Sequence, residues 1–189
     1  MVYLERWCSV IYIAIIVLVI IVSIIGWYIS VSNQLNRLVV KVDEAESGID
    51  VALTKRYDVL VKMMDTVKAY TKHEKETLFE VIKLRSGMTM AEKNKASHMM
   101  DENMNKINAL MESYPELKSS ENYLELQKSI LDVEEHLQAA RRLYNSNISI
   151  LNQLIVTFPA SMVANSKGLT KKDFFEAENH KQEDVKIDL

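Results

Sequence analysis

Residues 121–158 decide the fold of this chain, and they read ENYLELQKSILDVEEHLQAARRLYNSNISILNQLIVTF. One series of seven-residue steps is apolar or aromatic throughout and consists of Tyr123, Ile130, Leu137, Tyr144, Leu151 and Phe158. A second series consists of Leu126, Val133, Ala140, Asn147 and Leu154. Two interleaved heptad series over five repeats predict a long helix that packs knobs-into-holes against other helices. Asn147 either fixes the register of the seam or faces outward at its edge, and Pro159 ends the helix.

A long helix is also predicted from Ser30 to about Arg85, where Gly48 is the single glycine and proline is absent. Apolar residues recur there at steps of three and four, which is typical of an amphipathic helix, here continuous with the apolar segment before it. The stripe consists of Leu35, Val39, Val42, Ala45, Ile49, Leu53, Leu60, Met63, Val67, Tyr70, Leu78, Val81 and Leu84.

A further helix is predicted between these two. Ser86-Gly87 is a plausible helix stop, and Thr89-Met-Ala-Glu92 has the form of a capping box. The apolar positions of this helix are Met100, Met104, Ile107, Met111 and Tyr114. Pro115 interrupts the pattern, and Ser119 and Ser120 are candidate N-caps for the next helix. The methionines offer an adaptable binding face, but core packing is the favoured interpretation.

These patterns predict an all-α fold: an N-terminal transmembrane helix followed by an antiparallel bundle of three long helices plus a short C-terminal helix. Short links between long amphipathic segments favour antiparallel neighbours. Gly168 and Thr170 indicate a break, after which the short helix is expected through Phe174 and Phe175. The predicted organisation is a tail at 1–9, the transmembrane helix at 10–29, the bundle at 30–178 and a charged tail at 179–189.

Residues 10–29, VIYIAIIVLVIIVSIIGWYI, carry no charge and are long enough to span the hydrocarbon core of a membrane. Trp7 precedes the segment and Trp27 and Tyr28 end it, where aromatic rings favour the interface. A cleaved signal peptide would need a shorter apolar core, a more basic start and a small-x-small cleavage site. We therefore expect a retained, single-pass anchor in the cell membrane, without a clear oligomerisation motif.

The charge pattern excludes some classes of partner. The chain has 23 basic and 26 acidic residues, which are well mixed in sign, and it lacks the basic stripe of a nucleic-acid-binding protein. Arg6 precedes the anchor, whereas Arg37, Lys41, Lys55 and Arg56 follow it. The positive-inside rule therefore leans toward a cytoplasmic soluble domain. The single cysteine, Cys8, excludes a disulfide framework within the chain.

Several blocks of the sequence resemble the LemA family, a bacterial group with a membrane helix followed by a helical bundle. The blocks are Asp43-Glu-Ala-Glu-Ser-Gly-Ile-Asp50-Val, Lys55-Arg56-Tyr-Asp58, Thr66-Val-Lys-Ala-Tyr70-Thr-Lys-His73-Glu74 with Thr77-Leu78, Tyr114-Pro115-Glu-Leu-Lys with Asn122-Tyr123 and Leu126-Gln127, Ala140-Arg141-Arg142-Leu-Tyr144-Asn145, Asn152, Phe158-Pro159 and Phe174-Phe175-Glu176. The resemblance covers essentially the full length. It implies a membrane-bound helical protein without an established catalytic activity.

The sequence departs from the family pattern at two positions that bear on the bundle. The family usually has tryptophan where Glu46 stands and proline where Val61 stands, and its Ile-Pro-Asn-Leu-Val stretch is replaced by residues 60–64. Valine suits a helix interior better than proline, so the bundle should be retained. A contact that depends on the tryptophan would be lost.

Motifs for catalysis are incomplete. His73-Glu74 begins like H-E-x-x-H, but Thr77 stands where the second histidine is needed to reach the same zinc ion. The di-iron motif Glu-x-x-His also fails, because Val133 lies three residues before His136. No phosphate-binding glycine loop is present, and we predict no catalytic residue, metal ligand or cofactor.

Arg141 and Arg142 are the strongest candidates for binding a partner, since guanidinium groups form bidentate contacts with carboxylates or phosphates. An interhelical ion pair with Asp50 or Asp58 is the favoured alternative. The other positions that the resemblance marks as interacting or bundle-defining are Arg56, His73, Glu74, Tyr144, Asn145, Asn152, Phe158 and Pro159.

The functional expectation is a membrane-anchored, non-enzymatic scaffold or interaction protein of the bacterial envelope, which binds other envelope proteins or itself. The alternative is a metal-binding protein or an enzyme that uses Glu and His residues brought together across the bundle.

Overall fold

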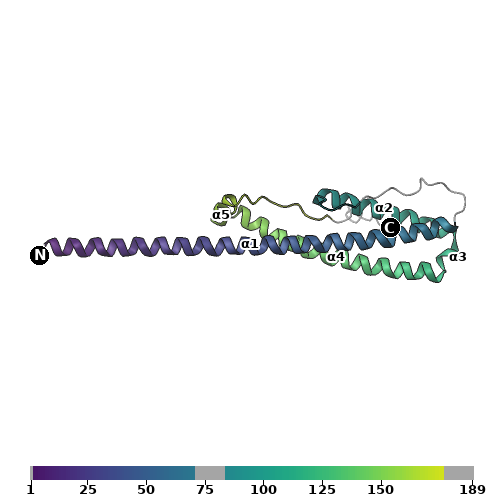
Figure 1. Ribbon diagram of the computed structural model, residues 1–189, viewed down its shortest axis with the longest axis horizontal. Coiled ribbons are helices and arrows are strands. Elements are labelled where there is room, and N and C mark those ends of the chain that lie inside the picture. Colours follow the sequence, from purple (N-terminus) through teal and green to yellow (C-terminus); the bar gives the residue numbers. More distant parts are fainter. Residues whose placement is uncertain (1, 71–83, 177–189) are drawn as a thin grey trace, which may run out of the picture. The chain divides into compact units, whose positions relative to one another are not determined.

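The computed structural model describes residues 2–70 and 84–176, and its regular secondary structure is helical throughout these residues (Figure 1). The helices are α1 (Val2–Tyr70), α2 (Met90–Ser113), α3 (Pro115–Lys118), α4 (Glu121–Val156) and α5 (Ala160–Ser166). The predicted all-α class is confirmed. The chain divides into two compact units, which we call the anchor unit (1–41 and 149–171) and the bundle unit (42–148 and 172–189).

The apolar segment predicted to be the anchor forms the N-terminal part of α1. Large apolar side chains are exposed from Ile11 to Ile29, and Trp27 and Tyr28 are partly exposed at the end of this run. Within the described residues, α1 is the one unbroken helix that is long and apolar enough to cross a membrane. The helix continues without a break into the amphipathic stripe that follows, as the sequence pattern predicted.

The core of the bundle unit is formed by α1, α2 and α4. The stripe of α1 is buried at Val42, Ala45, Ile49, Ala52, Leu53, Leu60, Met63 and Val67. The matching positions of α2 are Met90, Ala96, Met100, Ile107 and Met111. Burial of such a side chain contributes about 1.5–3 kcal/mol to stability. Most of the predicted core is therefore confirmed, although Met104 is half-buried and Tyr114 is exposed.

The ion pairs give the direction of each helix. On α1 and α2, Glu46 and Asp50 pair with Lys93, and Arg56 pairs with Asp101, so the two helices run in the same direction. Arg56 also pairs with Glu134, whereas the more N-terminal Gly48 lies beside Ala140, so α4 runs antiparallel to α1. The predicted antiparallel arrangement is therefore found between α1 and α4, whereas α1 and α2 are parallel. The parallel pair is possible because residues 71–89 separate α1 from α2, a length that allows the chain to return.

The end of α1 differs from the expectation of one helix to about Arg85. The described part of α1 extends to Tyr70, and residues 84–89 are not helical, so the helix does not include Leu84 or Arg85. Gly87 has φ +76°, a conformation that glycine adopts without steric cost. Leu78 and Val81 lie outside the described residues. The next helix begins as predicted, because Thr89 and Glu92 form the capping box at the start of α2.

The seam of α4 follows the heptad pattern at its start and departs from it at its end. Tyr123, Ile130, Leu137, Tyr144 and Leu151 are buried, as predicted. Phe158 is 76% exposed because α4 ends two residues before it, at Val156, so this member of the series was wrong. A straight helix drifts by ~20° per heptad relative to a seven-residue repeat, so the buried stripe moves to new positions over five heptads. Ile148 and Ile155 are buried instead, while Asn147 is only half-buried, at the edge of the seam.

In the anchor unit, the last part of α4 and α5 supply the buried residues Leu151, Ile155, Ala160, Val163 and Ala164. The facing part of α1 supplies Leu35 and Leu38. The axes of α4 and α5 differ by 98°, and the Phe158–Pro159 peptide bond between these helices is cis. The short C-terminal helix of the predicted fold is present as α5, which precedes Gly168. Its predicted position was wrong, since residues 169–176 are not helical.

Candidate functional site

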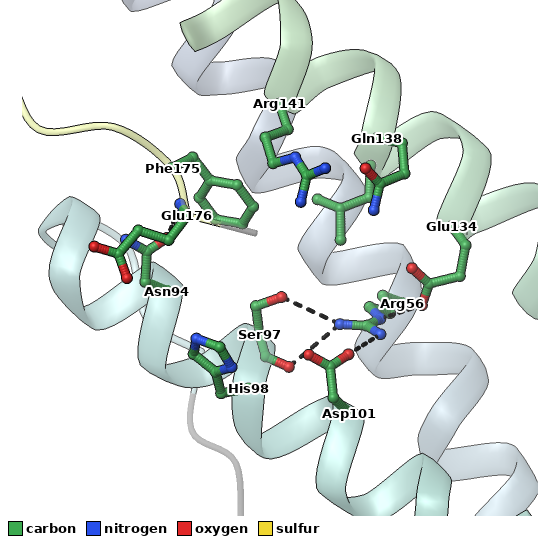
Figure 2. Close-up of a pocket in the computed structure, with 11 residues that line it drawn as sticks. Arg56, Asn94, Ser97, His98, Asp101, Glu134, Gln138, Arg141, Phe175 and Glu176 are labelled. Atoms are coloured by element: carbon green, nitrogen blue, oxygen red, sulfur yellow. Dashed lines mark hydrogen bonds and ion pairs between the residues drawn. The ribbon is translucent and has the colours of Figure 1, made fainter. Parts of the chain in front are cut away.

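A buried arginine joins the three long helices of the bundle unit. Arg56 is 5% exposed and occupies the gap in the α1 stripe between Leu53 and Leu60. Its Nη2 pairs with Asp101 on α2, and its Nε lies 2.5 Å from Glu134 Oε1 on α4. Nη1 donates to the main-chain oxygen and to Oγ of Ser97, at 3.3 and 3.2 Å. The guanidinium is therefore satisfied by partners on both neighbouring helices (Figure 2).

A buried lysine forms a second link between α1 and α2. Lys93 is 4% exposed, and its Nζ lies 2.7 Å from Asp50 Oδ1 and 2.9 Å from Glu46 Oε1. Burial alone would lower the pKa of Lys93, but the hydrogen bonds to Asp50 and Glu46 outweigh burial and raise the pKa above its ordinary value. Glu46, which stands where the family usually has tryptophan, therefore compensates the buried cation.

An extended segment, residues 172–176, which we call the arm, is bound along its main chain by two asparagines. On α4, Asn145 Nδ2 donates to the Phe175 oxygen and Asn145 Oδ1 accepts from the Phe175 nitrogen, both at 2.9 Å. On α2, Asn94 Nδ2 donates to the Phe174 oxygen at 3.3 Å, and Asn94 Oδ1 accepts from the Glu176 nitrogen at 3.1 Å. Each amide side chain thus takes the place of a neighbouring strand.

Three further contacts fix the arm. The Phe175 side chain is 2% exposed. The Tyr144 hydroxyl donates to the Asp173 oxygen at 3.1 Å, and Lys172 Nζ lies 3.1 Å from Asp43 Oδ1 on α1. Burial, followed by the negative charges of Glu46, Asp173 and Asp43, raises the pKa of Tyr144 to about 12, so its hydroxyl remains a donor at neutral pH. All three long helices therefore contact the arm.

A small opening of about 20 Å³ lies between the arm, α2 and α4. Its lining includes Arg56, Ser97, His98, Asp101 and Arg141 (Figure 2). A volume of this size holds about one water molecule. The cluster therefore joins the helices, and its opening has room for little more than water.

The two arginines singled out from the sequence are placed differently from the expectation. Arg141 is half-buried and lines the small opening, and Arg142 is exposed. Neither forms an ion pair with a described residue, so the expected pair with Asp50 or Asp58 was wrong. The physical reason is that Lys93 already occupies Asp50, while Asp58 is exposed.

The remaining candidates separate into two groups. Arg56, Tyr144 and Asn145 come together around the arm and the ion-pair cluster. Asn152, Phe158 and Pro159 belong to the anchor unit, where Asn152 is half-buried and the other two are exposed. His73 and Glu74 lie outside the described residues.

Several contributing residues were missed from the sequence. Lys93 and Asn103 stand at buried positions of the α2 stripe, three residues after Met90 and Met100, and this spacing was a usable signal. Asn94, Ser97, Asp101 and Glu134 gave no comparable signal, because a polar residue on the edge of a helix is usually solvated. Among the described residues, no group of three or more His, Cys, Asp or Glu side chains is placed to hold a metal ion.

Comparison with known proteins adds two findings. Residues 45–189 match the model of the LemA family. Protein LemA from Metamycoplasma hominis (strain ATCC 23114 / DSM 25592 / NBRC 14850 / NCTC 10111 / PG21) is 31% identical over 163 residues, which cover 84% of this chain and 74% of that protein.

Proposed function

This chain belongs to the LemA family, and from that premise we propose that it is a membrane-anchored, non-enzymatic interaction protein of the bacterial envelope. The observation that carries the proposal is the binding of the arm. The surface of α2 and α4 that contacts the arm, here called the groove, binds this extended segment of the same chain through its main-chain groups, with Asn94 and Asn145 as matched donors and acceptors. Recognition of main-chain groups in an extended conformation is a general mode of peptide binding.

The charged residues support the same proposal. Arg56 and Lys93 are buried and engaged in ion pairs between helices, which fix the positions of α1, α2 and α4 around the groove. Breaking such a buried pair on one side costs about 3–5 kcal/mol, so we propose that these pairs hold the helices around the groove in place. Rigidity of this kind favours binding, because less conformational entropy is lost when a partner docks.

The soluble part is proposed to face the cytoplasm. Arg37 and Lys41 follow the anchor in sequence, and the fold adds Lys167, whose Nζ bonds Asn36 Oδ1 at 2.8 Å. The other flank carries Glu5 beside Arg6. Cytoplasmic flanks of membrane helices are enriched in Lys and Arg. Labelling of a cysteine introduced at Ser47 on a Cys8→Ala background tests this: an impermeant maleimide should react in permeabilised cells and fail to react in intact cells.

In-cell photo-crosslinking tests the interaction. A photo-reactive amino acid is placed at Phe174 on the arm, at Arg142 on α4, or at the matched exposed position Val51 on α1. A discrete second protein from one face, absent from another, is the expected result. Self-crosslinks alone would convert the proposal into a homo-oligomeric scaffold. The same abundant bystanders at all three positions would contradict it.

The alternative of a metal-binding protein or enzyme stays a prediction. Elemental analysis of the purified full chain distinguishes it, since stoichiometric metal retained through purification would favour this alternative over the interaction protein.

A further inference from the structure

We propose that the corner formed by the end of α4 and by α5 sits in the headgroup layer of a membrane rich in anionic phospholipid, beside the anchor. The inference rests on the anchor spanning that membrane. It concerns a surface that lies outside the groove between α2 and α4.

The corner exposes apolar side chains that water solvates poorly. Val156, the last residue of α4, is 55% exposed. Phe158 in the connection is 76% exposed, and Met162 on α5 is 62% exposed. Residues 143–166 contain no Asp, Glu, Lys or Arg. An exposed apolar cluster without a charged residue is typical of a surface that is covered in the native environment.

The fold fixes this corner close to the end of the anchor. Lys167 directly follows α5, and its Nζ bonds Asn36 Oδ1 at 2.8 Å. Asn36 lies seven residues after Ile29, which corresponds to ~10 Å along a helix. The polar headgroup region extends ~5–8 Å beyond the hydrocarbon core on each side. In Figure 1, α5 lies beside α1 at the end of α4. The corner is therefore at the depth of the headgroups or immediately next to it.

The charges of the same unit match an anionic surface. Outside the anchor, the anchor unit (30–41 and 149–171) has four basic residues, Arg37, Lys41, Lys167 and Lys171, and no acidic residue. The bundle unit has 18 basic and 25 acidic residues. The positive charge of the chain is thus concentrated next to the anchor, where basic residues are attracted to anionic lipid headgroups.

A groove in the same unit fits a lipid headgroup. It has a volume of about 480 Å³ and runs along α1 from Ser30 to Lys41, with Ile150 of α4 on its other side. Asn33, Gln34 and Arg37 also line it. The lining therefore has two cationic side chains and three neutral polar side chains, and it has no carboxylate. Such a lining suits the negatively charged phosphate diester of a lipid headgroup. Long basic side chains on such a surface reach back toward the interface while their stems contact apolar groups.

A second copy of the chain is a less suitable occupant. A symmetric contact through this corner would place the four cations of one copy against four cations of the other, with no acidic residue of either anchor unit to compensate them. Anionic lipid supplies the missing negative charge, and its headgroup layer covers Phe158 and Met162. Peripheral membrane binding commonly combines burial of apolar side chains with electrostatic attraction to anionic lipid.

The test uses the full chain on a Cys8→Ala background, reconstituted in nanodiscs of phosphatidylcholine alone or with about one third phosphatidylglycerol. Single cysteines at Met162, Leu131 or Ile20 carry a spin label. Leu131 belongs to the bundle unit and is 62% exposed, as is Met162, so it is the matched control. Collision with oxygen reports contact with lipid, and collision with a soluble nickel chelate reports contact with water.

The expected result is loss of nickel collisions at position 162 in the anionic nanodiscs, while position 131 stays accessible. Arg37→Gln combined with Lys171→Gln should restore nickel access at position 162. Equal nickel access at positions 162 and 131 would overturn the proposal, as would shielding that accompanies spin–spin broadening between two copies. Equal shielding in neutral nanodiscs would overturn the role of the anionic headgroup. The Ile20 label must be lipid-exposed in every case, and its exposure to water would show that the anchor had failed instead.

Discussion

Asn145 and Phe175 exchange two hydrogen bonds of 2.9 Å each, so that a side chain of α4 pairs with the main chain of the arm as one strand pairs with another. The aromatic ring of Phe175 is buried next to this pair. The position of the arm therefore depends on side-chain hydrogen bonds such as these, because residues 172–176 have no regular secondary structure of their own.

Replacing Asn145 by alanine should release the arm. Both hydrogen bonds are lost, and the main-chain groups of Phe175 lose their protein partner, which costs about 2 kcal/mol. Chemical denaturation of the full chain in micelles, followed by circular dichroism, measures the change, and limited proteolysis should cleave the arm faster. Asn105→Ala is the control, since Asn105 is exposed on α2 and should change stability by no more than about 0.5 kcal/mol. Equal effects of the two variants would contradict the prediction.

Replacing Arg56 by methionine should destabilise the bundle by about 3 kcal/mol, because Asp101 and Glu134 keep their charges without the guanidinium. The triple variant Arg56→Met, Asp101→Asn, Glu134→Gln should recover most of this loss, since it also removes the two negative charges that faced the guanidinium. Thermal unfolding of the single, double and triple variants measures the coupling. A triple variant no more stable than Arg56→Met would show that packing of the arginine, and not its charge, matters.

Tyr144 should make stability depend on alkaline pH. Its pKa of about 12 in the folded chain exceeds the value of about 10 for an unfolded tyrosine. The stabilisation is therefore complete below pH 10 and is lost as the pH rises through 12, by about 2–3 kcal/mol in total. The free energy of unfolding, measured from about pH 9 to about pH 12, should fall less steeply for Tyr144→Phe. Tyr114→Phe, at an exposed position, should retain the steep fall of the unmodified chain.

Leu137→Asp should unfold the bundle, because Leu137 is 3% exposed in the seam and a buried carboxylate without a partner costs about 4 kcal/mol or more. Circular dichroism should show lower helicity and a lower melting temperature. Leu131→Asp lies on the same helix at a position that is 62% exposed, and it should be nearly neutral. Unchanged helicity and melting of Leu137→Asp would count against the seam.

The helices and most of their buried faces were predictable because periodicity and caps are local properties of the sequence. The apolar N-terminal helix, the capping box of Thr89 and Glu92, and the start of the α4 seam follow from residues close together in the chain. The gap in the α1 stripe also marked the position of Arg56. Its partners were not predictable, since Asp101 and Glu134 are 45 and 78 residues away in sequence.

Hydrophobic periodicity predicted neither the parallel pairing of α1 and α2 nor the extended conformation of the arm. Helix direction depends on where residues 71–89 lead the chain, and hydrophobic periodicity does not encode that. The arm lacks helix because its main-chain groups bond to Asn94, Tyr144 and Asn145. Such bonds arise from tertiary structure and override the local preference of residues 169–176.

The hydrogen bond between Asn36 and Lys167 joins residues that are 131 positions apart. It can therefore form only some time after Asn36 has been synthesised. At ~5–20 residues per second, a ribosome delivers Lys167 roughly 7–26 s after Asn36. Leu35 and the stripe beyond it leave the ribosome long before α4 and α5 are available to cover them. The nascent chain must therefore persist with an incomplete core during this interval, and its yield in the cell should depend on the chaperones that bind it then.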